Sequence, residues 1–302
     1  MKNIVYFLHL NIARSKTLSE FYLNLLSKII KPFPDTKIKQ QILNSINSVN
    51  WQNLDLQPQN IIVGEKIQFK IIPHIQEFDC QSLLVKKVQY EVEVFDYLDK
   101  HIDKFDSVIE IGANVGIFTI YFYKSFLKHN KNIKIFAFEP SQKAYLRLLK
   151  NLEINKASGV QTYNSAIGNK VGFLDFFEPE GHLTNGSLNK EFADLFSEQV
   201  NQNKALVISA SYLSELVNED DKVLVKIDVE GSEFDVLSSL KDFILNQKPT
   251  LIIEVLHTYQ QHLNELKFLQ DNYNLYNLTS DGLIEHSQFE ATSFRDYLLK
   301  PK

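Results

Sequence analysis

The sequence is almost without cysteine, since Cys80 is the only one in 302 residues. A single thiol excludes an intrachain disulfide and a cysteine-rich zinc site. Chains without disulfides are typical of a reducing compartment, so the sequence predicts a cytoplasmic protein.

A basic excess and a long apolar run are also missing. The chain has 32 Lys and Arg against 37 Asp and Glu, a net charge of -5. This balance offers no electrostatic footprint for nucleic acid. No apolar run approaches the ~20 residues of a membrane-spanning helix. We therefore expect no nucleic-acid partner and no transmembrane segment, and the composition leaves a homo-oligomer open.

Glycine is scarce, with 10 residues, but two glycines mark the most informative stretch of the chain, residues 107–122. An apolar strand ends at Ile111, a tight loop runs from Gly112 to Gly116, and an apolar helix begins at Ile117. A strand, a loop and a helix N-terminus in this order direct backbone N–H groups at the strand tip. We expect free amides of this loop to face a ligand.

Strands alternate with helices from residue 107 onward. This alternation predicts an α/β fold, a Rossmann-like doubly wound and mostly parallel sheet with helices on both faces. An antiparallel pair of strands, 273–278 and 282–286, is expected to close the chain. The other predicted strands are 107–111, 133–138, 160–166, 222–228 and 250–255, with further candidates at 170–177 and 205–210, and the predicted helices are 141–154, 233–244 and 257–271.

Residues 1–60 predict a helical N-terminal extension, and residues 61–302 a Rossmann-like domain. Residues 61–90 are expected to enter that domain as a small β-hairpin, with 83–88 as a further strand, and 91–302 to form its core. We expect an apolar helix face in the extension to pack on the main domain; a substrate cap, a dimer arm and a membrane-surface helix are the alternatives. Three basic residues between Ala13 and Lys31 give little support to a basic membrane face. The apolar positions are Leu18, Phe21, Tyr22, Leu25, Leu26 and Ile29.

Polar residues follow the predicted strands at the edge where ligands bind in such sheets. Glu139 follows the second strand, where its carboxylate can accept hydrogen bonds from vicinal ribose hydroxyls. The sequence therefore predicts a nucleoside-containing cofactor. The other tips carry Glu110, the segment 164–168, Asp228 with Glu230, and Glu254 with His257.

Two cofactors compete for this edge. A dinucleotide fingerprint needs Gly-x-Gly-x-x-Gly so that the backbone can approach a pyrophosphate, but the residue at position 114 is Asn. Glu110 also adds negative charge beside the loop. Both features favour S-adenosylmethionine, which carries a sulfonium, an ammonium and a carboxylate but no phosphate. A dinucleotide-dependent oxidoreductase and a non-catalytic S-adenosylmethionine-binding module are the alternatives.

Four motifs together resemble the FkbM family of methyltransferases: residues 110–116, 138–140, 165–168 and 226–233, with Tyr90-Glu91 resembling the family's entry helix. The resemblance implies a Rossmann-like enzyme that transfers a methyl group from S-adenosylmethionine, usually to a hydroxyl of a sugar, glycan or secondary metabolite. It implies that Glu110, Gly112, Asn114 and Gly116 hold the methionine part, Glu139 the ribose, Ser165, Ala166 and Ile167 the adenine, and that Asp228 lies beside the methyl group, with Glu91, Ala113 and Pro140 also binding cofactor.

Methylation of a hydroxyl requires the loss of a proton, so a general base is expected within hydrogen-bond reach. Asp228 and Glu230 are the candidates, because both follow the fourth strand of the predicted sheet. Glu254 and His257 are further candidates near the same edge, and we expect no metal ion. The polar loop 177–187 is expected to form a lid through which His182 and Asn185 meet the acceptor.

Overall fold

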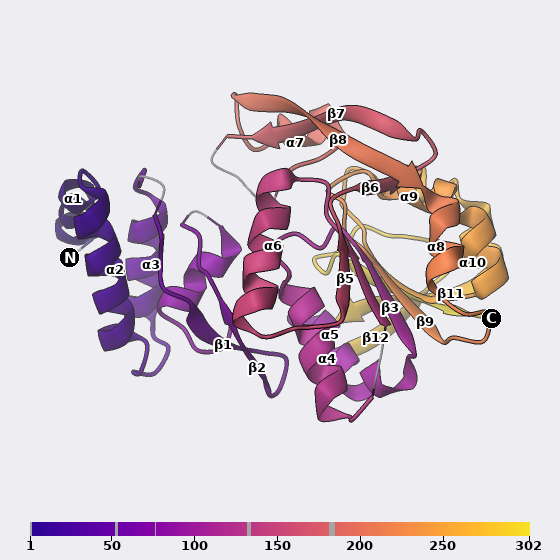
Figure 1. Cartoon of the computed structure of the whole chain (residues 1–302), viewed down its shortest axis with the longest axis horizontal. Coiled ribbons are helices and arrows are strands. Elements are labelled where there is room, and N and C mark those ends of the chain that lie inside the picture. The colour runs from indigo at the N-terminus through magenta and orange to yellow at the C-terminus, as the bar shows by residue number, and fades with distance from the viewer. Residues whose placement is uncertain (1, 52–53, 76, 132–133, 181–184) are drawn as a thin grey trace. The chain divides into compact units, whose positions relative to one another are not determined.

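The computed structural model describes residues 2–51, 54–75, 77–131, 134–180 and 185–302 (Figure 1). The chain forms two compact units, Met1–Tyr90 and Glu91–Lys302. The sequence-based boundary at residue 60 differs from this division, because the hairpin lies in the same unit as the N-terminal helices. Among the described residues, no helix is both long and apolar enough to span a membrane.

The N-terminal unit combines three helices with one hairpin. Its small core joins Leu23 and Ile46 of the helices to Trp51, Cys80 and Leu84 of later segments. The elements are α1 (Lys2–Ile12), α2 (Lys16–Ile30), α3 (Lys37–Asn47), β1 (Gln59–Val63), β2 (Ile67–Ile71) and a 3-10 helix, η1 (Phe78–Leu83). The predicted hairpin is confirmed as the antiparallel pair β1–β2. The predicted strand 83–88 is wrong, since only Lys87 makes a bridge, to Ile62.

The buried face of α2 is not the one that its apolar stripe predicts. The buried residues of this helix are Ser19, Leu23 and Ser27. The hydroxyl of Ser19 donates to the carbonyl oxygens of Ile12 and Ser15, and that of Ser27 donates to Gln59 Oε1. Hydrogen bonding thus permits two serines to be buried. Of the six residues expected to pack, Tyr22 and Leu26 are partly buried against the core, but Leu18, Phe21, Leu25 and Ile29 are exposed.

The C-terminal unit is built on an eight-stranded sheet (Figure 1). Five adjacent strands are parallel, and the last three are added antiparallel, each to its neighbour. In spatial order they are β12 (Gly282–His286), β11 (Tyr273–Thr279), β13 (Asp296–Pro301), β10 (Thr250–Glu254), β9 (Val223–Ile227), β3 (Ser107–Ile111), β4 (Lys134–Phe138) and β5 (Val160–Tyr163). The predicted Rossmann-like, mostly parallel sheet is confirmed.

Helices cover both faces of this sheet. On one face, Leu237 of α9 and Ile244 of α10 pack on strand residues such as Val225. On the other, Phe95 of α4 stacks on Phe118 of α5, and α5 lies against β3 and β4. The helices are α4 (Val92–His101), η2 (Ile102–Lys104), α5 (Ile117–Lys128), α6 (Gln142–Ile154), α7 (Lys190–Ala193), η3 (Ala210–Tyr212), α8 (Leu213–Leu216), α9 (Glu233–Ser239), α10 (Lys241–Gln247), α11 (Gln260–Leu263) and α12 (Lys267–Asn272).

The longer predicted helices agree with these bounds only in part. The helix predicted at 141–154 is confirmed, and Ser141 caps it by accepting from the amide of Ala144. The helix predicted at 233–244 is split at Leu240 into α9 and α10. The one predicted at 257–271 is two short helices, because a turn precedes Gln260 and a break follows Leu263.

A second sheet of three strands completes this unit. It consists of β6 (Ala166–Gly168), β8 (Val200–Ser209) and β7 (Gly172–Pro179), with β8 in the middle. β7 and β8 are the strands predicted near 170–177 and 205–210. They form a long antiparallel pair that brings Pro179 opposite Val200.

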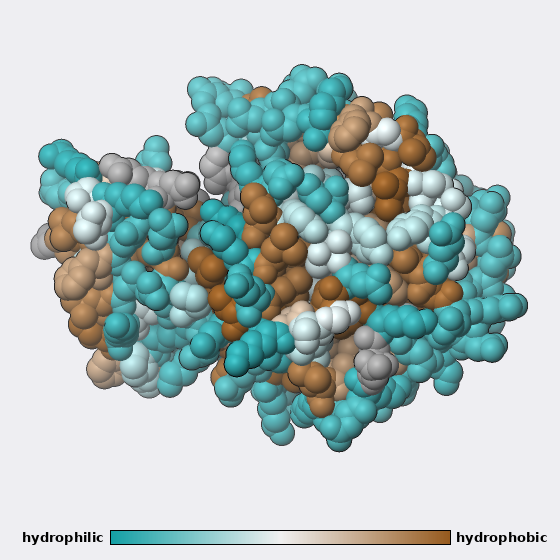
Figure 2. All heavy atoms as spheres, viewed as in Figure 1, coloured by the Kyte–Doolittle hydropathy of each residue, from teal (hydrophilic) through white to brown (hydrophobic). Residues whose placement is uncertain are grey.

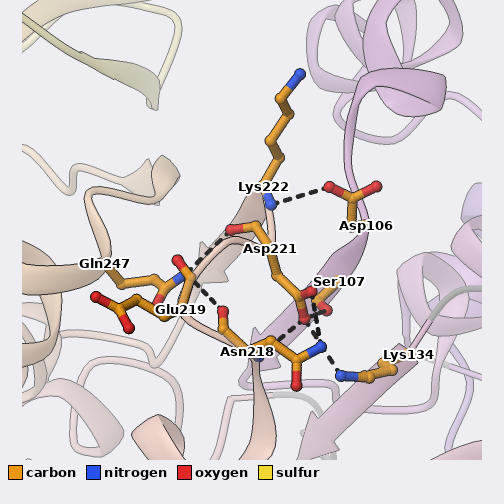
Figure 3. Close-up of polar contacts among 8 residues, drawn as sticks. All are labelled: Asp106, Ser107, Lys134, Asn218, Glu219, Asp221, Lys222 and Gln247. Atoms are coloured by element: carbon orange, nitrogen blue, oxygen red, sulfur yellow. Dashed lines mark hydrogen bonds and ion pairs between the residues drawn. The ribbon is translucent and has the colours of Figure 1, made fainter.

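Asp221 forms hydrogen bonds between neighbouring segments at the edge of the large sheet where β3 and β9 begin (Figure 3). Its Oδ2 accepts from Ser107 Oγ, the Asn218 amide and Lys134 Nζ, at 2.8, 3.0 and 3.3 Å, and its Oδ1 accepts from Asn218 Nδ2. Burial raises the pKa of Asp221, but these donors lower it more, to about 2. The folded pKa therefore lies below the ordinary 3.8.

We expect Asp221→Ala to lower the free energy of unfolding by roughly 1–3 kcal/mol at pH 7, because charge-assisted hydrogen bonds are lost. The exposed neighbour Asp220→Ala carries the same charge change and serves as the control. A group with a depressed pKa stabilises above its unfolded pKa, and this contribution is lost as pH falls from about 4 to about 2. Urea denaturation of both variants at pH 7 and at pH 3 should show the difference shrinking. Equal stability of the two at pH 7 would contradict the role of Asp221.

Candidate functional site

A pocket opens at the carboxyl ends of β3, β4 and β9. Its empty volume is about 640 Å³, including space open to solvent, which is within the usual range for small-molecule sites. Eight residues predicted from the sequence line it: Gly112, Asn114, Glu139, Pro140, Ser165, Ala166, Ile167 and Asp228. Glu230, the second predicted catalytic residue, lines it as well.

Gly112 allows β3 and β9 to approach each other at the base of the pocket. Its φ of +92° lies in the left-handed region, and a Cβ at this position would lie 1.7 Å from the carbonyl oxygen of Asp228. The amide of Asp228 in turn donates to the carbonyl oxygen of Ile111. Only glycine fits here, because any side chain would displace the backbone of Asp228.

The amides of the loop 112–116 are largely occupied by the protein itself. Those of Gly112 and Ala113 both donate to the carbonyl oxygen of Phe138, and that of Gly116 donates to Ala113. The Asn114 amide donates to Glu139 Oε2 at 2.7 Å. The expectation of free amides is therefore wrong for these four residues. Because hydrogen bonds within the fold satisfy them, the loop is not an anion cradle of the kind that a pyrophosphate needs.

Glu139 is buried, at 6% exposure, and both of its carboxylate oxygens accept from backbone amides. Oε2 accepts from Asn114 and Oε1 from Ser141, each at 2.7 Å. Burial raises the pKa of Glu139 to about 7, although the two amides oppose the rise. Each carboxylate oxygen has two acceptor sites, so both retain capacity for a ligand hydroxyl in the pocket.

Asp228 is held by a buried chain of charges behind the pocket. Lys226 Nζ lies 2.9 Å from Asp228 Oδ2 and 3.3 Å from Glu91 Oε2. The lysine is 2% exposed, and its Nζ lies 4.3 Å from the centre of the Phe118 ring. Burial lowers the pKa of Lys226, but Asp228, Glu91 and Asp296 raise it more, so the net pKa is well above 10.5. The lysine therefore stays charged and fixes one side of the Asp228 carboxylate.

Glu230 has a different environment from Asp228. Its backbone φ is +54°, and its carbonyl oxygen accepts from Ser187 Oγ. Burial raises the pKa of Glu230 to about 9, with further contributions from the charges of Asp228 and Glu233. Glu233 accepts from the amides of Val229 and Gly231, which fixes the turn that leads into α9. Near neutral pH Glu230 is thus a protonated group, able to donate rather than to accept a proton.

The description of one family model decides the identity of this domain. The model is described as a methyltransferase FkbM domain, and it matches residues 110–276, more than half of the chain. The chain belongs to the FkbM methyltransferase family.

Two curated methyltransferases are similar in sequence to this FkbM domain. "Methyltransferase 1" of Beauveria bassiana is 27% identical over 149 residues, which cover 45% of this chain and 58% of the relative. "Methyltransferase sdnD" of Sordaria araneosa is 26% identical over 160 residues, covering 45% and 60%. The chain thus spans about three fifths of the curated relatives it matches. A crystal structure of "Methyltransferase FkbM" from Methylobacillus flagellatus KT has a TM-score of 0.40 at 14% identity, covering 74% of this chain and 55% of that one.

Four predicted cofactor-binding residues are not among those that line the pocket of the FkbM domain: Glu91, Glu110, Ala113 and Gly116. Glu91 pairs with Lys226 instead. Glu110 accepts from Thr119 Oγ1 at 2.6 Å, and burial raises its pKa to about 8. A Cβ on Gly116 would lie 2.4 Å from Leu148 Cδ1, so this glycine serves the contact between α5 and α6. Ala113 is buried.

Glu254 and His257 do not line the pocket either. Glu254 lies opposite Asp296 in the sheet, 3.6 Å from an Arg295 nitrogen, and burial raises its pKa well above the ordinary value. His257 is exposed on the turn before α11.

Several pocket residues of the FkbM domain carry no sequence signal of their own. The stretch Gly186–Leu188 contributes one wall, because Ser187 pairs with Phe177 and bonds to Glu230. Gly186 and Ser187 of the predicted lid segment thus line the pocket, whereas Asn185 does not, and His182 lies outside the described residues. Of the other lining residues, four lie within the family motifs without having been assigned a role, Ile111, Phe138, Val229 and Ser232, and four lie outside them, Ser141, Ala144, Phe176 and Val236.

Proposed function

We propose that this chain is an S-adenosylmethionine-dependent methyltransferase that methylates a hydroxyl of a sugar, a glycan or a secondary metabolite. The observation that supports this most is the charge of the pocket. Among the described residues, its lining includes the carboxylates of Glu139 and Asp228 and the protonated carboxyl of Glu230, but no Lys or Arg. Acidic oxygens suit ribose hydroxyls and a sulfonium cation, whereas a pyrophosphate needs donors or cations.

The residues of the pocket fit this cofactor. Glu139 has remaining acceptor capacity for two neighbouring hydroxyls. Ser165 Oγ is buried in the lining and has no hydrogen-bond partner among the described residues, as expected of a group that awaits a ligand. Ala166, Ile167 and Phe138 supply apolar surface for a base. When bound, S-adenosylmethionine supplies a methyl group already activated on sulfur.

Asp228 is the residue that we assign as general base. Lys226 fixes Oδ2, and no hydrogen bond among the described residues reaches Oδ1. Oδ1 thus remains available to accept the proton of an acceptor hydroxyl. Glu230 is a poorer base, because a carboxyl with a pKa of about 9 already carries its proton at neutral pH. It can instead donate a hydrogen bond to the acceptor.

Calorimetry tests the cofactor directly. The chain should bind S-adenosylhomocysteine, and Glu139→Ala should weaken that binding at least tenfold, because the acceptor for the ribose hydroxyls is lost. Glu153→Ala, an exposed change on α6, is the control and should leave the affinity unchanged. Circular dichroism establishes that each variant is folded. Tight binding of NAD without binding of S-adenosylhomocysteine would replace the proposal by a dinucleotide-dependent oxidoreductase.

A further inference from the structure

The N-terminal unit has an apolar helix face that its own core does not use. Leu18, Phe21, Leu25 and Ile29 recur at spacings of three and four residues and so share one face of α2. They are between 42% and 65% exposed. Phe7 of α1 is exposed as well. In Figure 2, hydrophobic residues gather over the region where Figure 1 draws α1 and α2. Patches of this kind mark interaction sites on soluble proteins.

A basic groove lies at the C-terminal end of the same helix. Its empty volume is about 920 Å³, including space open to solvent. Three lysines line it, Lys28 of α2, Lys31 directly after α2 and Lys86 from a distant segment, and the described lining includes no Asp or Glu. Lys31 Nζ donates to the carbonyl oxygen of Ser82 at 2.6 Å, and burial lowers its pKa to about 8. Lys28 is roughly 100° round the helix from Ile29 and flanks the apolar face, whereas Ser27 and Lys31 place the rest of the groove toward the buried side of α2.

The two units of the chain carry net charges of opposite sign. Residues 1–90 hold 11 Lys and Arg against 6 Asp and Glu, whereas residues 91–302 hold 21 against 31. The N-terminal unit thus has a net charge of +5 within a chain of net charge -5. A second copy of this unit on the same face would meet like charge, which disfavours self-association there. An anionic occupant is complementary.

We propose that the N-terminal unit docks on the surface of a bilayer that contains anionic phospholipids. The exposed face of α2 enters the boundary between headgroups and acyl chains, as apolar faces of interfacial helices do. Lys28, at the flank of this face, contacts lipid phosphates, and Lys31 and Lys86 add to the positive potential that attracts them. The few basic residues between Ala13 and Lys31 do not predict this groove, because Lys86 contributes to it from far along the chain. The proposal is independent of the methyl-transfer chemistry.

Vesicle co-sedimentation of the full chain tests this docking. Vesicles of phosphatidylcholine with 30% phosphatidylglycerol should bind the chain, and vesicles of phosphatidylcholine alone should bind it at least tenfold more weakly. Raising the salt concentration from about 0.1 M to about 0.5 M should weaken binding, because screening shortens the reach of the lysines. Binding that is equal on both vesicles, or absent from both, would overturn the proposal.

Two sets of variants separate the apolar and the basic contributions. Phe21→Ser with Leu25→Ser should reduce binding at least tenfold without unfolding the chain, because both side chains are exposed. Lys28→Gln with Lys86→Gln should reduce it about fivefold per lysine on anionic vesicles only. Phe173→Ser, at a residue 70% exposed on β7, is the control and should bind like the unmodified chain. Light scattering without lipid measures the oligomeric state. A dimer that dissociates on Phe21→Ser would overturn the proposal and assign the apolar face to contact with a second copy of the chain.

Discussion

Asp228→Asn is expected to slow methyl transfer by roughly 10²- to 10⁴-fold, the range that a general base contributes. The amide has the same shape as the carboxylate but cannot take the proton of an acceptor hydroxyl. Its oxygen can still accept from Lys226 Nζ, so the local structure should persist. We therefore expect kcat to fall while the affinity for S-adenosylhomocysteine changes less than threefold. Stopped assays with labelled methyl donor, combined with calorimetry, measure both quantities.

Glu230→Gln is the matched comparison for this prediction. Because Glu230 is protonated near neutral pH, its amide isostere keeps a hydrogen-bond donor and should retain most of the activity. Asp220→Asn, exposed at the opposite edge of the sheet, controls for the loss of one negative charge. If Glu230→Gln is slow and Asp228→Asn is not, the two roles must be exchanged. If every form binds S-adenosylhomocysteine and none transfers methyl to any hydroxyl acceptor, a non-catalytic binding module becomes the better account.

The sheet and the position of the pocket could be predicted because both depend on local pattern. Buried parallel strands are continuous apolar runs, and a glycine with a positive φ marks the end of the first of them at Gly112. The carboxyl ends of neighbouring parallel strands lie at one edge of the sheet, so the sequence alone predicts that Glu139 and Asp228 lie near the same site.

Contacts between distant residues set the rest of the site, and local pattern cannot reveal them. The amide of Asn114 is occupied by a carboxylate 25 residues away, so an amide that local pattern predicts to be free for a ligand already has a partner in the fold. Glu91 and Lys226 are far apart in sequence but form an ion pair, and Glu91 does not line the pocket. On α2, the serines are buried because their partners, such as Gln59, come from other elements. In each case a hydrogen bond or ion pair with a residue distant in sequence determines where the group lies, and the local sequence pattern does not contain that partner.

Lys226→Met should be the most destabilising of the substitutions considered. It removes the cation between Glu91 and Asp228 while leaving both carboxylates in place. Breaking a buried ion pair from one side typically costs 3–5 kcal/mol, because the remaining charge is uncompensated. Lys222→Met is the control, since that side chain is exposed and Lys222 bonds to Asp106 only through its backbone amide and carbonyl groups (Figure 3). We expect a loss of roughly 3–5 kcal/mol in urea denaturation for Lys226→Met and less than about 0.5 kcal/mol for Lys222→Met.

The pH dependence of this loss follows from the raised pKa of Lys226. A lysine whose folded pKa exceeds its unfolded value stabilises fully below the unfolded value of 10.5, and the contribution is lost only as pH rises through the folded pKa. The titration of the lysine itself should therefore add no pH dependence to the difference between Lys226→Met and the unmodified chain between about pH 6 and pH 9. A double variant with Asp228→Asn should recover part of the stability, because it removes one of the two uncompensated carboxylates. If the double variant is as unstable as the sum of the single ones, Lys226 does not act through Asp228, and the assigned orientation of the base loses its support.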